Sequence, residues 1–133
     1  MKKPAEIVIP ETLRYAKDHE WMSLIAPFRV GVSDFAQDQL GDITYVELPE
    51  PGAAFAAGQE FGSLESIKSV SPLYLPADGK VAAINERLRD DPGLVNQDPY
   101  GAGWLVEIEL FRPEQAALLM DAAAYRRHIG TEA

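Results

Sequence analysis

Lys68 is the residue of this sequence whose setting most suggests chemistry. It lies in LESIKSVS (64–71), which alternates apolar and polar residues in the manner of a half-buried strand. Small Ser66 and Ser69 stand beside it, between two short apolar segments. A tight hairpin here would hold the ammonium at an exposed tip, where acylation removes its charge and adds a long flexible arm. The plain alternative is a solvated strand lysine, which is the usual role of such a residue.

The two histidines, His19 and His128, are the other side chains that invite a catalytic interpretation. His19 lies in KDHEW between Asp18 and Glu20, so a general base or a metal site is conceivable. A single local histidine without a distant partner favours a turn or packing role instead. His128 is expected to be solvated near the end of a helix. The chain has no cysteine, which excludes thiolate nucleophiles, thiolate zinc sites and disulfides within it.

Familiar catalytic and nucleotide-binding motifs are missing from the sequence. No serine stands in Gly-x-Ser-x-Gly, and the separated glycines form neither a phosphate loop nor a dinucleotide fingerprint. Neighbouring acids such as Asp90 and Asp91 are better explained by turns and surface positions. The sequence therefore predicts no enzyme and no metal site, but a non-catalytic protein.

Composition indicates one acidic domain, with boundaries at residues 1–133. The 133 residues carry 21 acidic and 12 basic side chains, a formal net charge of −9. Such a chain lacks the basic field that nucleic-acid binding needs. The apolar run within MKKPAEIVIP (1–10) is too short for a membrane span and is interrupted by Pro10. We therefore expect no signal peptide, no membrane partner and a cytoplasmic protein, with a monomer as the default.

Short strands separated by frequent turns predict a mainly β protein. Strands are expected at 13–15, 21–25, 28–32, 42–48, 60–67, 71–76, 80–85 and 103–110. Within 42–48, Ile43, Tyr45 and one of Val46 or Leu48 are expected to face inward. Pro-Gly turns and similar strand patterns recur in 51–67 and 92–108, which suggests two related β units. This pattern is typical of a small sandwich or barrel.

Two helical segments are expected around these strands. Ser33 can cap a short helix formed by DFAQDQL, Phe35 and Leu40 supply its buried side, and Gly41 ends it. Residues 113–128 follow a helical spacing of apolar residues and begin with a proline suited to a first turn. Both helices are expected to be peripheral.

Five segments in register resemble the glycine cleavage system H protein family. They cover the chain from Leu13 to about Tyr125: RYAKDHEW, VGVSDFAQDQLGDITYVELPEPG, FGSLESIKSVSPLY, VNQDPYGAGWLVEIEL and LLMDAAAYR. The resemblance implies a barrel-sandwich hybrid of the lipoyl/biotinyl-carrier type, with two related antiparallel sheets and short peripheral helices. It is the combination of several motifs, and not Glu-Ser-x-Lys alone, that makes the resemblance specific.

The resemblance also implies a cofactor and partners. Lys68 matches the family lysine that carries lipoic acid in amide linkage. In that family the lipoyl arm takes an aminomethyl group from glycine decarboxylase and delivers it to aminomethyltransferase, and dihydrolipoamide dehydrogenase reoxidises it. Glu65 is similar to the family glutamate that helps a lipoylating enzyme recognise the site. The simpler alternative is that Glu65 only pairs with Lys68 across the turn.

Departures from the family pattern gather at the cleft that shelters the arm. Glu20 matches an acidic cleft residue of the family. Pro72 stands where the family typically has Asp, and Phe35 stands where it has His or Tyr. Losing a carboxylate makes the cleft a poorer host for an amine cation, although Pro72 would also stiffen the strand exit.

These departures leave other carriers open. H-like lipoyl proteins that carry sulfur intermediates to a heterodisulfide-reductase-like complex would not need the same carboxylates. A biotinyl carrier or an unmodified interaction domain is a further alternative. Biotinyl domains typically flank the lysine with methionines, and Ile67 and Ser69 stand there instead.

Overall fold

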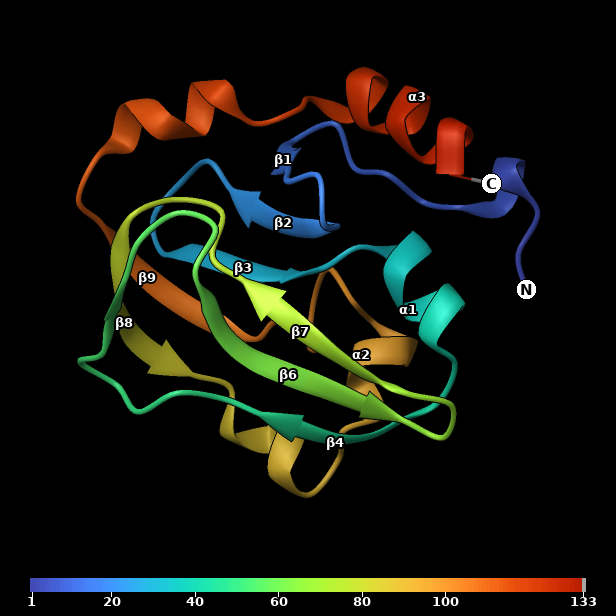
Figure 1. The fold of residues 1–133 in the computed structure, drawn as a ribbon, viewed down its shortest axis with the longest axis horizontal. Helices are drawn as coiled ribbons and strands as arrows, with labels where there is room; N and C mark the ends of the chain where they lie inside the picture. The colour runs from blue at the N-terminus through green and yellow to red at the C-terminus, as the bar shows by residue number, and fades with distance from the viewer. Residues whose placement is uncertain (133) are drawn as a thin grey trace.

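Two antiparallel sheets dominate the computed structural model, which describes residues 1–132 and the side chains of residues 1–130. The larger sheet has the strand order β1 (Leu13–Tyr15), β2 (Glu20–Ser23), β3 (Phe28–Val32), β9 (Val106–Leu110), β8 (Gly79–Ile84) and β5 (Ala54–Phe55). The smaller sheet has the order β4 (Ile43–Glu47), β6 (Glu60–Ser66) and β7 (Val70–Tyr74). Every pairing is antiparallel, so the mainly β prediction is confirmed (Figure 1).

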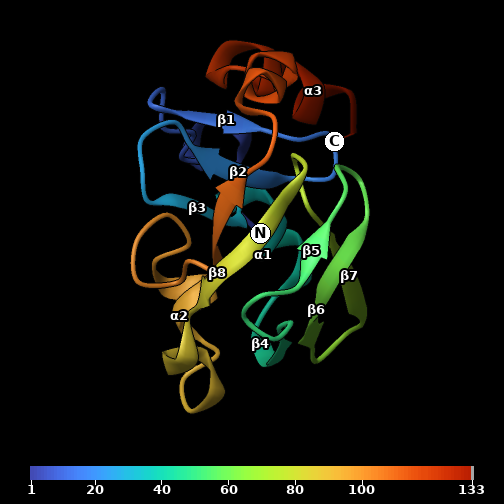
Figure 2. The same cartoon turned by 90° about the vertical axis from the view of Figure 1, so that its left-hand side faces the viewer.

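Short helices surround the sheets. The α-helices are α1 (Asp34–Leu40), α2 (Leu94–Gln97) and α3 (Ala122–Glu132), and the 3-10 helices are η1 (Pro4–Glu6), η2 (Glu86–Arg89) and η3 (Pro113–Leu118). Both cartoon views place α3 over β1 at one end of the molecule (Figures 1 and 2). Within residues 1–132, no helix combines the length and the apolar character needed to cross a bilayer.

The main core lies between the two sheets. Met22, Val30 and Val106 from the larger sheet are fully buried with Leu64 and Leu73 from the smaller one. Neighbouring residues of a strand point to opposite faces, so each of these strands directs one of the five side chains into the space between the sheets. Full burial of one such side chain stabilises the fold by about 1.5–3 kcal/mol. Packing between the sheets therefore fixes the positions of β6 and β7 relative to β2.

A second cluster attaches α3 and the N-terminal segment to the larger sheet. The rings of Tyr15 and Tyr125 stack with centroids 4.5 Å apart, and Ile7 and Ile129 are buried beside them. The prediction of one continuous helix over 113–128 is wrong. The segment contains two separate helices, because η3 ends at Leu118 and α3 starts only at Ala122. The intervening chain is extended because Met120 exchanges backbone hydrogen bonds with Tyr15 of β1.

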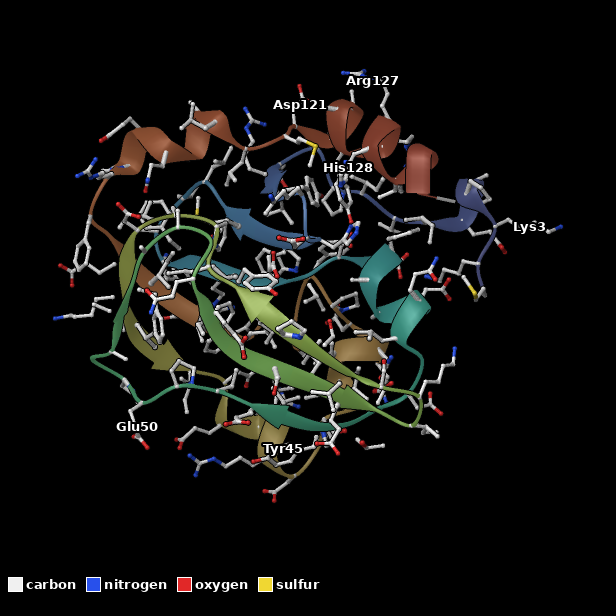
Figure 3. All side chains as sticks on the ribbon, viewed as in Figure 1. Lys3, Tyr45, Glu50, Asp121, Arg127 and His128 are labelled. Atoms are coloured by element: carbon white, nitrogen blue, oxygen red, sulfur yellow. The ribbon has the colours of Figure 1, made fainter. Side chains whose placement is uncertain are left out.

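Two further expectations need correction. Tyr45 was expected to face inward but is 57% exposed, because the pairing of β4 with β6 shifts register between Ile43 and Tyr45. Val46 takes the inward position, and Tyr45 lies on the exposed side of β4, at the lower edge of the view in Figure 3. A shift of one residue moves the following side chains to the other face of a strand.

The buried side of α1 also differs from the expectation. Phe35 and Leu40 are only half-buried, whereas Asp34 and Gln37 are the buried residues of this helix. The predicted cap is confirmed, since Ser33 Oγ accepts from the Ala36 N–H over 3.2 Å. The apolar residues of α1 are only partly buried because they line an open cleft as well as packing against the two core clusters.

Candidate functional site

Lys68 lies at the tip of the β6–β7 hairpin, in the turn formed by residues 67–69. Ser66, the last residue of β6, builds this turn: its Oγ accepts from the N–H groups of Lys68 and Ser69, each over 3.2 Å. The Ser66 N–H in turn donates to Ser69 O over 2.8 Å. A serine hydroxyl that bonds nearby backbone groups is a common way to stabilise a tight turn. The Lys68 side chain is consequently held away from the core and is exposed.

The Lys68 side chain leans toward the end of α1. Its Cε and Nζ lie 3.5 and 3.7 Å from the position that a Cβ on Gly41 would occupy, and Figure 1 shows the hairpin tip beside α1. Gly41 has φ +78° and ψ −162°, a conformation almost restricted to glycine. It therefore ends α1 and leaves open space where the lysine crosses the helix end.

Asn96, a residue that the sequence did not single out, fixes this end of α1. Its Nδ2 donates to Gly41 O over 2.9 Å and to Gln37 Oε1 over 3.0 Å. Its Oδ1 accepts from the Ile43 N–H over 2.9 Å. One amide side chain thus provides hydrogen-bond partners for a backbone carbonyl at the end of α1 and for a backbone N–H at the start of β4. The sequence indicated this role only weakly, because Asn96 lies more than fifty residues from its hydrogen-bond partners.

A cleft of about 280 Å³ begins beside this helix. It is lined by Asp18, His19, Glu20, Val32, Phe35, Ala36, Gln39, Leu40, Leu64, Ser71, Pro72 and Leu73. The structure therefore brings together the three residues that the sequence assigned to a cleft, Glu20, Phe35 and Pro72. Glu65 and Lys68 do not line the cleft; they belong to the neighbouring hairpin.

The α1 face of the cleft is an apolar stripe that begins near Lys68. Leu40 lies at the Gly41 end of the helix, Ala36 one turn earlier, and Phe35 near the start. At 1.5 Å per residue, the stripe from Leu40 to Phe35 is about 7.5 Å long. A lysine extended by an acyl chain is longer than this stripe, so a modified Lys68 could follow α1 into the cleft.

Glu20 is the buried acid of the cleft. It is 1% exposed, and its Oε2 accepts from the Tyr74 N–H over 3.0 Å. Its Oε1 is buried and has no hydrogen-bond partner among the described residues. Burial raises the pKa of the Glu20 carboxyl to about 8; the Tyr74 hydrogen bond opposes this effect, and the Asp18 carboxylate adds to it. An unpartnered buried oxygen is costly, and a cationic donor entering the cleft would remove that cost.

His19 forms part of the cleft wall through packing and hydrogen bonding. It has φ +80°, its Nδ1 lies 2.8 Å from Tyr125 Oη, and its ring packs against Phe35 with centroids 5.0 Å apart. The turn and packing role favoured from the sequence agrees with this geometry. His128 is not simply solvated: it is half-buried, and its Nε2 lies 2.8 Å from Lys17 O. Figure 3 shows His128 on the inner side of α3, with Arg127 pointing away.

Glu65 is exposed on the outer face of the smaller sheet. It stands opposite Tyr45 of β4 and Val70 of β7 in the strand register, and both of those side chains are exposed as well. The described residues contain no ion pair between Glu65 and Lys68, so the simpler alternative for Glu65 has no support. Within residues 1–130 no group of His, Asp and Glu side chains is arranged to hold a metal ion.

Comparisons with known proteins agree with this geometry. The family model described as glycine cleavage H-protein matches residues 13–132. The chain is 49% identical over 118 residues to the glycine cleavage system H protein of Symbiobacterium thermophilum, covering 88% of this chain and 92% of that one. It is 52% identical to the corresponding Myxococcus xanthus protein, with the same coverage of each chain.

A solved structure extends the similarity to the fold. The crystal structure of a glycine cleavage system H protein from Mycobacterium marinum is similar to this chain with a TM-score of 0.84. The two are 38% identical, and the match covers 92% of this chain and 99% of the other.

Proposed function

Since the chain belongs to the glycine cleavage H-protein family, we propose that it is the lipoyl carrier of a glycine cleavage system. It moves an aminomethyl group from glycine decarboxylase to aminomethyltransferase and is a carrier subunit without catalysis of its own. The observation that carries this proposal is the match over residues 13–132, which includes an exposed hairpin lysine next to a cleft with a buried acid.

Lys68 is the attachment site in this proposal. Lipoic acid in amide linkage there would supply a flexible arm and the pair of redox sulfurs that a cysteine-free chain lacks. The hairpin presents the amine to a lipoylating enzyme, and Glu65 on the adjacent face is the recognition residue. Gly41 and the apolar stripe of α1 guide the modified side chain toward the cleft.

Glu20, Phe35 and Pro72 form the resting place of the arm. Apolar side chains of α1 and β7 fit an alkyl chain, and the unpartnered Glu20 Oε1 fits an amine cation. Phe35 excludes water from the end of the cleft. Pro72 contributes an apolar surface and no donor, so the polar contacts must come from the opposite wall.

The other components of the system are its partners. Dihydrolipoamide dehydrogenase is the third enzyme that must accept the arm, and a lipoylating enzyme must act first. The acidic composition of the chain suits steering toward basic sites on these partners. The comparisons give no support to a sulfur-carrying role with a heterodisulfide-reductase-like complex. A cytoplasmic location and a monomeric state stay predictions.

Intact-mass measurement after co-expression with a lipoylating system tests the attachment site. We expect one lipoyl-sized increase in the wild type, none in Lys68→Ala, and an unchanged increase in the control Lys80→Ala, which alters an exposed lysine of β8. An increase that persists in Lys68→Ala contradicts the assignment. The lipoylated protein is then mixed with glycine decarboxylase and labelled glycine, and failure to load label contradicts the aminomethyl cargo.

A further inference from the structure

A separate cavity, of about 430 Å³, lies where the N-terminal segment, α1 and α3 meet. Figure 1 shows these three segments together, on the side of the molecule where both chain ends lie. The cavity shares only Phe35 and Gln39 with the cleft beside Glu20, and Lys68 does not line it. Its volume is within the range of about 300–1,000 Å³ that is usual for sites binding small molecules.

The lining of this cavity is mainly apolar. Its apolar side chains are those of Met1, Pro4, Ile7, Phe35 and Ile129. Ile7 and Ile129 are held in place by burial in the cluster below α3. Gly130 contributes no side chain, and a Cβ added there would meet no atom within 4 Å. The α3 side of the cavity is therefore open space that an apolar chain can fill.

One wall of the cavity belongs to a segment that the family match does not include. The match begins at residue 13, whereas residues 1–7 supply four of the lining side chains. This segment is bound to the rest of the fold: the Val8 N–H donates to Asp34 Oδ2 over 2.8 Å, and Tyr100 Oη donates to Val8 O over 2.6 Å. The structure thus forms a defined cavity that the family resemblance does not account for.

Arg126 is a cation at this cavity that forms no ion pair with the described residues. Its Nη1 and Nη2 donate to Pro4 O and Ile7 O, each over 3.3 Å. A guanidinium carries more N–H donors than these two and stays charged at any working pH. An unpaired guanidinium beside apolar side chains is complementary to a carboxylate at the end of an apolar chain.

The other charged residues of the lining already have partners. Lys2 Nζ donates to Asp34 Oδ2 over 2.7 Å, and the Lys2 backbone N–H donates to Asp38 over 2.9 Å. The Asp38 carboxylate repels a second anion, so a bound carboxylate must lie at the Arg126 end. The formal net charge of −9 also disfavours binding of anions elsewhere on the surface.

We propose that this cavity binds a medium-chain alkyl carboxylate, with the chain against Ile7, Phe35 and Ile129 and the carboxylate on Arg126. The chain is stabilised by leaving water, and the planar guanidinium can donate to both carboxylate oxygens. The site belongs to the unmodified chain, so it does not depend on the proposed carrier function.

Calorimetric titration of the unmodified protein with hexanoate, octanoate and decanoate, each below its micelle concentration, tests the binding. Burial of each added CH₂ group predicts an affinity that rises about fourfold per group until the chain fills the cavity. Absence of decanoate binding at millimolar concentration, or an affinity that does not change with chain length, overturns the inference.

Three variants locate the site: Arg126→Gln, Gly130→Leu and the control Arg127→Gln. Arg127 does not line the cavity and points away from the molecule (Figure 3). Arg126→Gln should weaken octanoate binding about tenfold or more and leave binding of n-octanol nearly unchanged, because only the carboxylate loses a charge-assisted hydrogen bond. Gly130→Leu should remove binding of both compounds, since leucine fills the open space and favours a helix more than glycine does.

Amide nuclear magnetic resonance spectra show that each variant is folded and where the ligand lies. Octanoate should shift the amide signals of Phe35, Ile129 and Gly130. Arg126→Lys keeps the charge without the planar pair of donors, so its affinity should lie between those of the wild type and Arg126→Gln. Unchanged octanoate affinity in Arg126→Gln, equal weakening in Arg127→Gln, or binding that persists in Gly130→Leu overturns the inference.

Discussion

Glu20 Oε2 accepts the backbone N–H of Tyr74 over 3.0 Å, and this bond joins the first residue of β2 to the last residue of β7. It connects the larger sheet to the smaller one at the cleft. The carboxyl group is thereby fixed in orientation, with Oε1 left unpartnered. β7, the strand that follows the Lys68 turn, thus determines where the Glu20 carboxyl lies in the cleft.

Replacing this acid should change how stability depends on pH. Burial raises the pKa of Glu20 to about 8, against about 4.5 when unfolded. The folded protein therefore keeps a proton that the unfolded chain releases, so the free energy of unfolding should fall as pH rises from about 4.5 to 8, by on the order of 4 kcal/mol for a shift of this size.

Glu20→Gln keeps the acceptor for Tyr74 but cannot titrate, so its unfolding free energy should lose this pH dependence. Urea unfolding between pH 4.5 and 8.5 measures the slope for each protein. Glu109→Gln, on an exposed position of β9, is the matched control and should retain the wild-type slope. A Glu20→Gln slope identical to that of the wild type would contradict the assigned pKa.

Gly41→Ala should destabilise the end of α1. The backbone conformation at Gly41 is nearly exclusive to glycine, and an added Cβ would meet Lys68 only at ordinary contact distance. We therefore expect a loss of about 1–3 kcal/mol from backbone strain, measured by chemical denaturation. Gly130→Ala, within α3 and with open space around it, should instead be neutral or stabilising by up to about 1 kcal/mol. The reverse order of the two variants would refute the explanation.

Glu65→Gln should slow lipoylation without affecting the fold. Glu65 is exposed next to the hairpin tip and makes no ion pair with Lys68 among the described residues. Loss of one charge-assisted hydrogen bond to the modifying enzyme costs about 1.5–3 kcal/mol, which is roughly a 10- to 100-fold lower rate constant. The measurement is the rate of mass gain with purified lipoylating enzyme. Glu60→Gln, exposed at the other end of β6, should react as the wild type does; equal rates for both variants would exclude Glu65 from recognition.

Asp34→Asn should loosen the N-terminal segment. Asp34 is 3% exposed and accepts from Lys2 Nζ over 2.7 Å, the Val8 N–H over 2.8 Å and Gln37 Nε2 over 2.8 Å. Burial alone would raise its pKa, but these hydrogen bonds and the Lys2 charge outweigh it and lower the pKa. The contribution of Asp34 to the free energy of unfolding is therefore present at neutral pH and is lost as pH falls through the folded pKa of its carboxyl group.

The loss expected for Asp34→Asn at pH 7 is about 2–3 kcal/mol, and it should shrink toward acidic pH. Asp38→Asn is the control, because Asp38 accepts a hydrogen bond only from the exposed Lys2 backbone N–H among the described residues. Thermal unfolding at pH 7 and pH 3 distinguishes the two. A larger effect of Asp38→Asn at pH 7 would contradict the role given to Asp34.

Local patterns were sufficient where a structural feature depends on nearby residues. The alternation around Lys68, the cap at Ser33 and the ending at Gly41 each involve contacts within a few residues. The strands at 13–15 and 28–32 were predicted with the bounds observed, since short strands between turns are defined by composition and alternation.

Local patterns gave wrong predictions where packing between distant segments determines the exposure or the conformation of a residue. Tyr45 is exposed because β4 shifts its register against β6, which no property of residues 42–48 reveals. The helix expected at 113–128 is interrupted because Met120 pairs with Tyr15, more than a hundred residues earlier. Backbone pairing with a distant strand outweighed a local helical preference.

The sequence by itself determined the identity of the family, the mainly β architecture and the lysine at an exposed turn. The tertiary structure decided the nature of the cleft. Glu20 is buried with one oxygen unpartnered only because β7 packs across the start of β2, and Asp18 lines the cleft only because the fold brings the β1–β2 turn, α1 and β7 to its walls. Burial and electrostatic coupling depend on which surfaces meet, and spacing along a chain does not specify that.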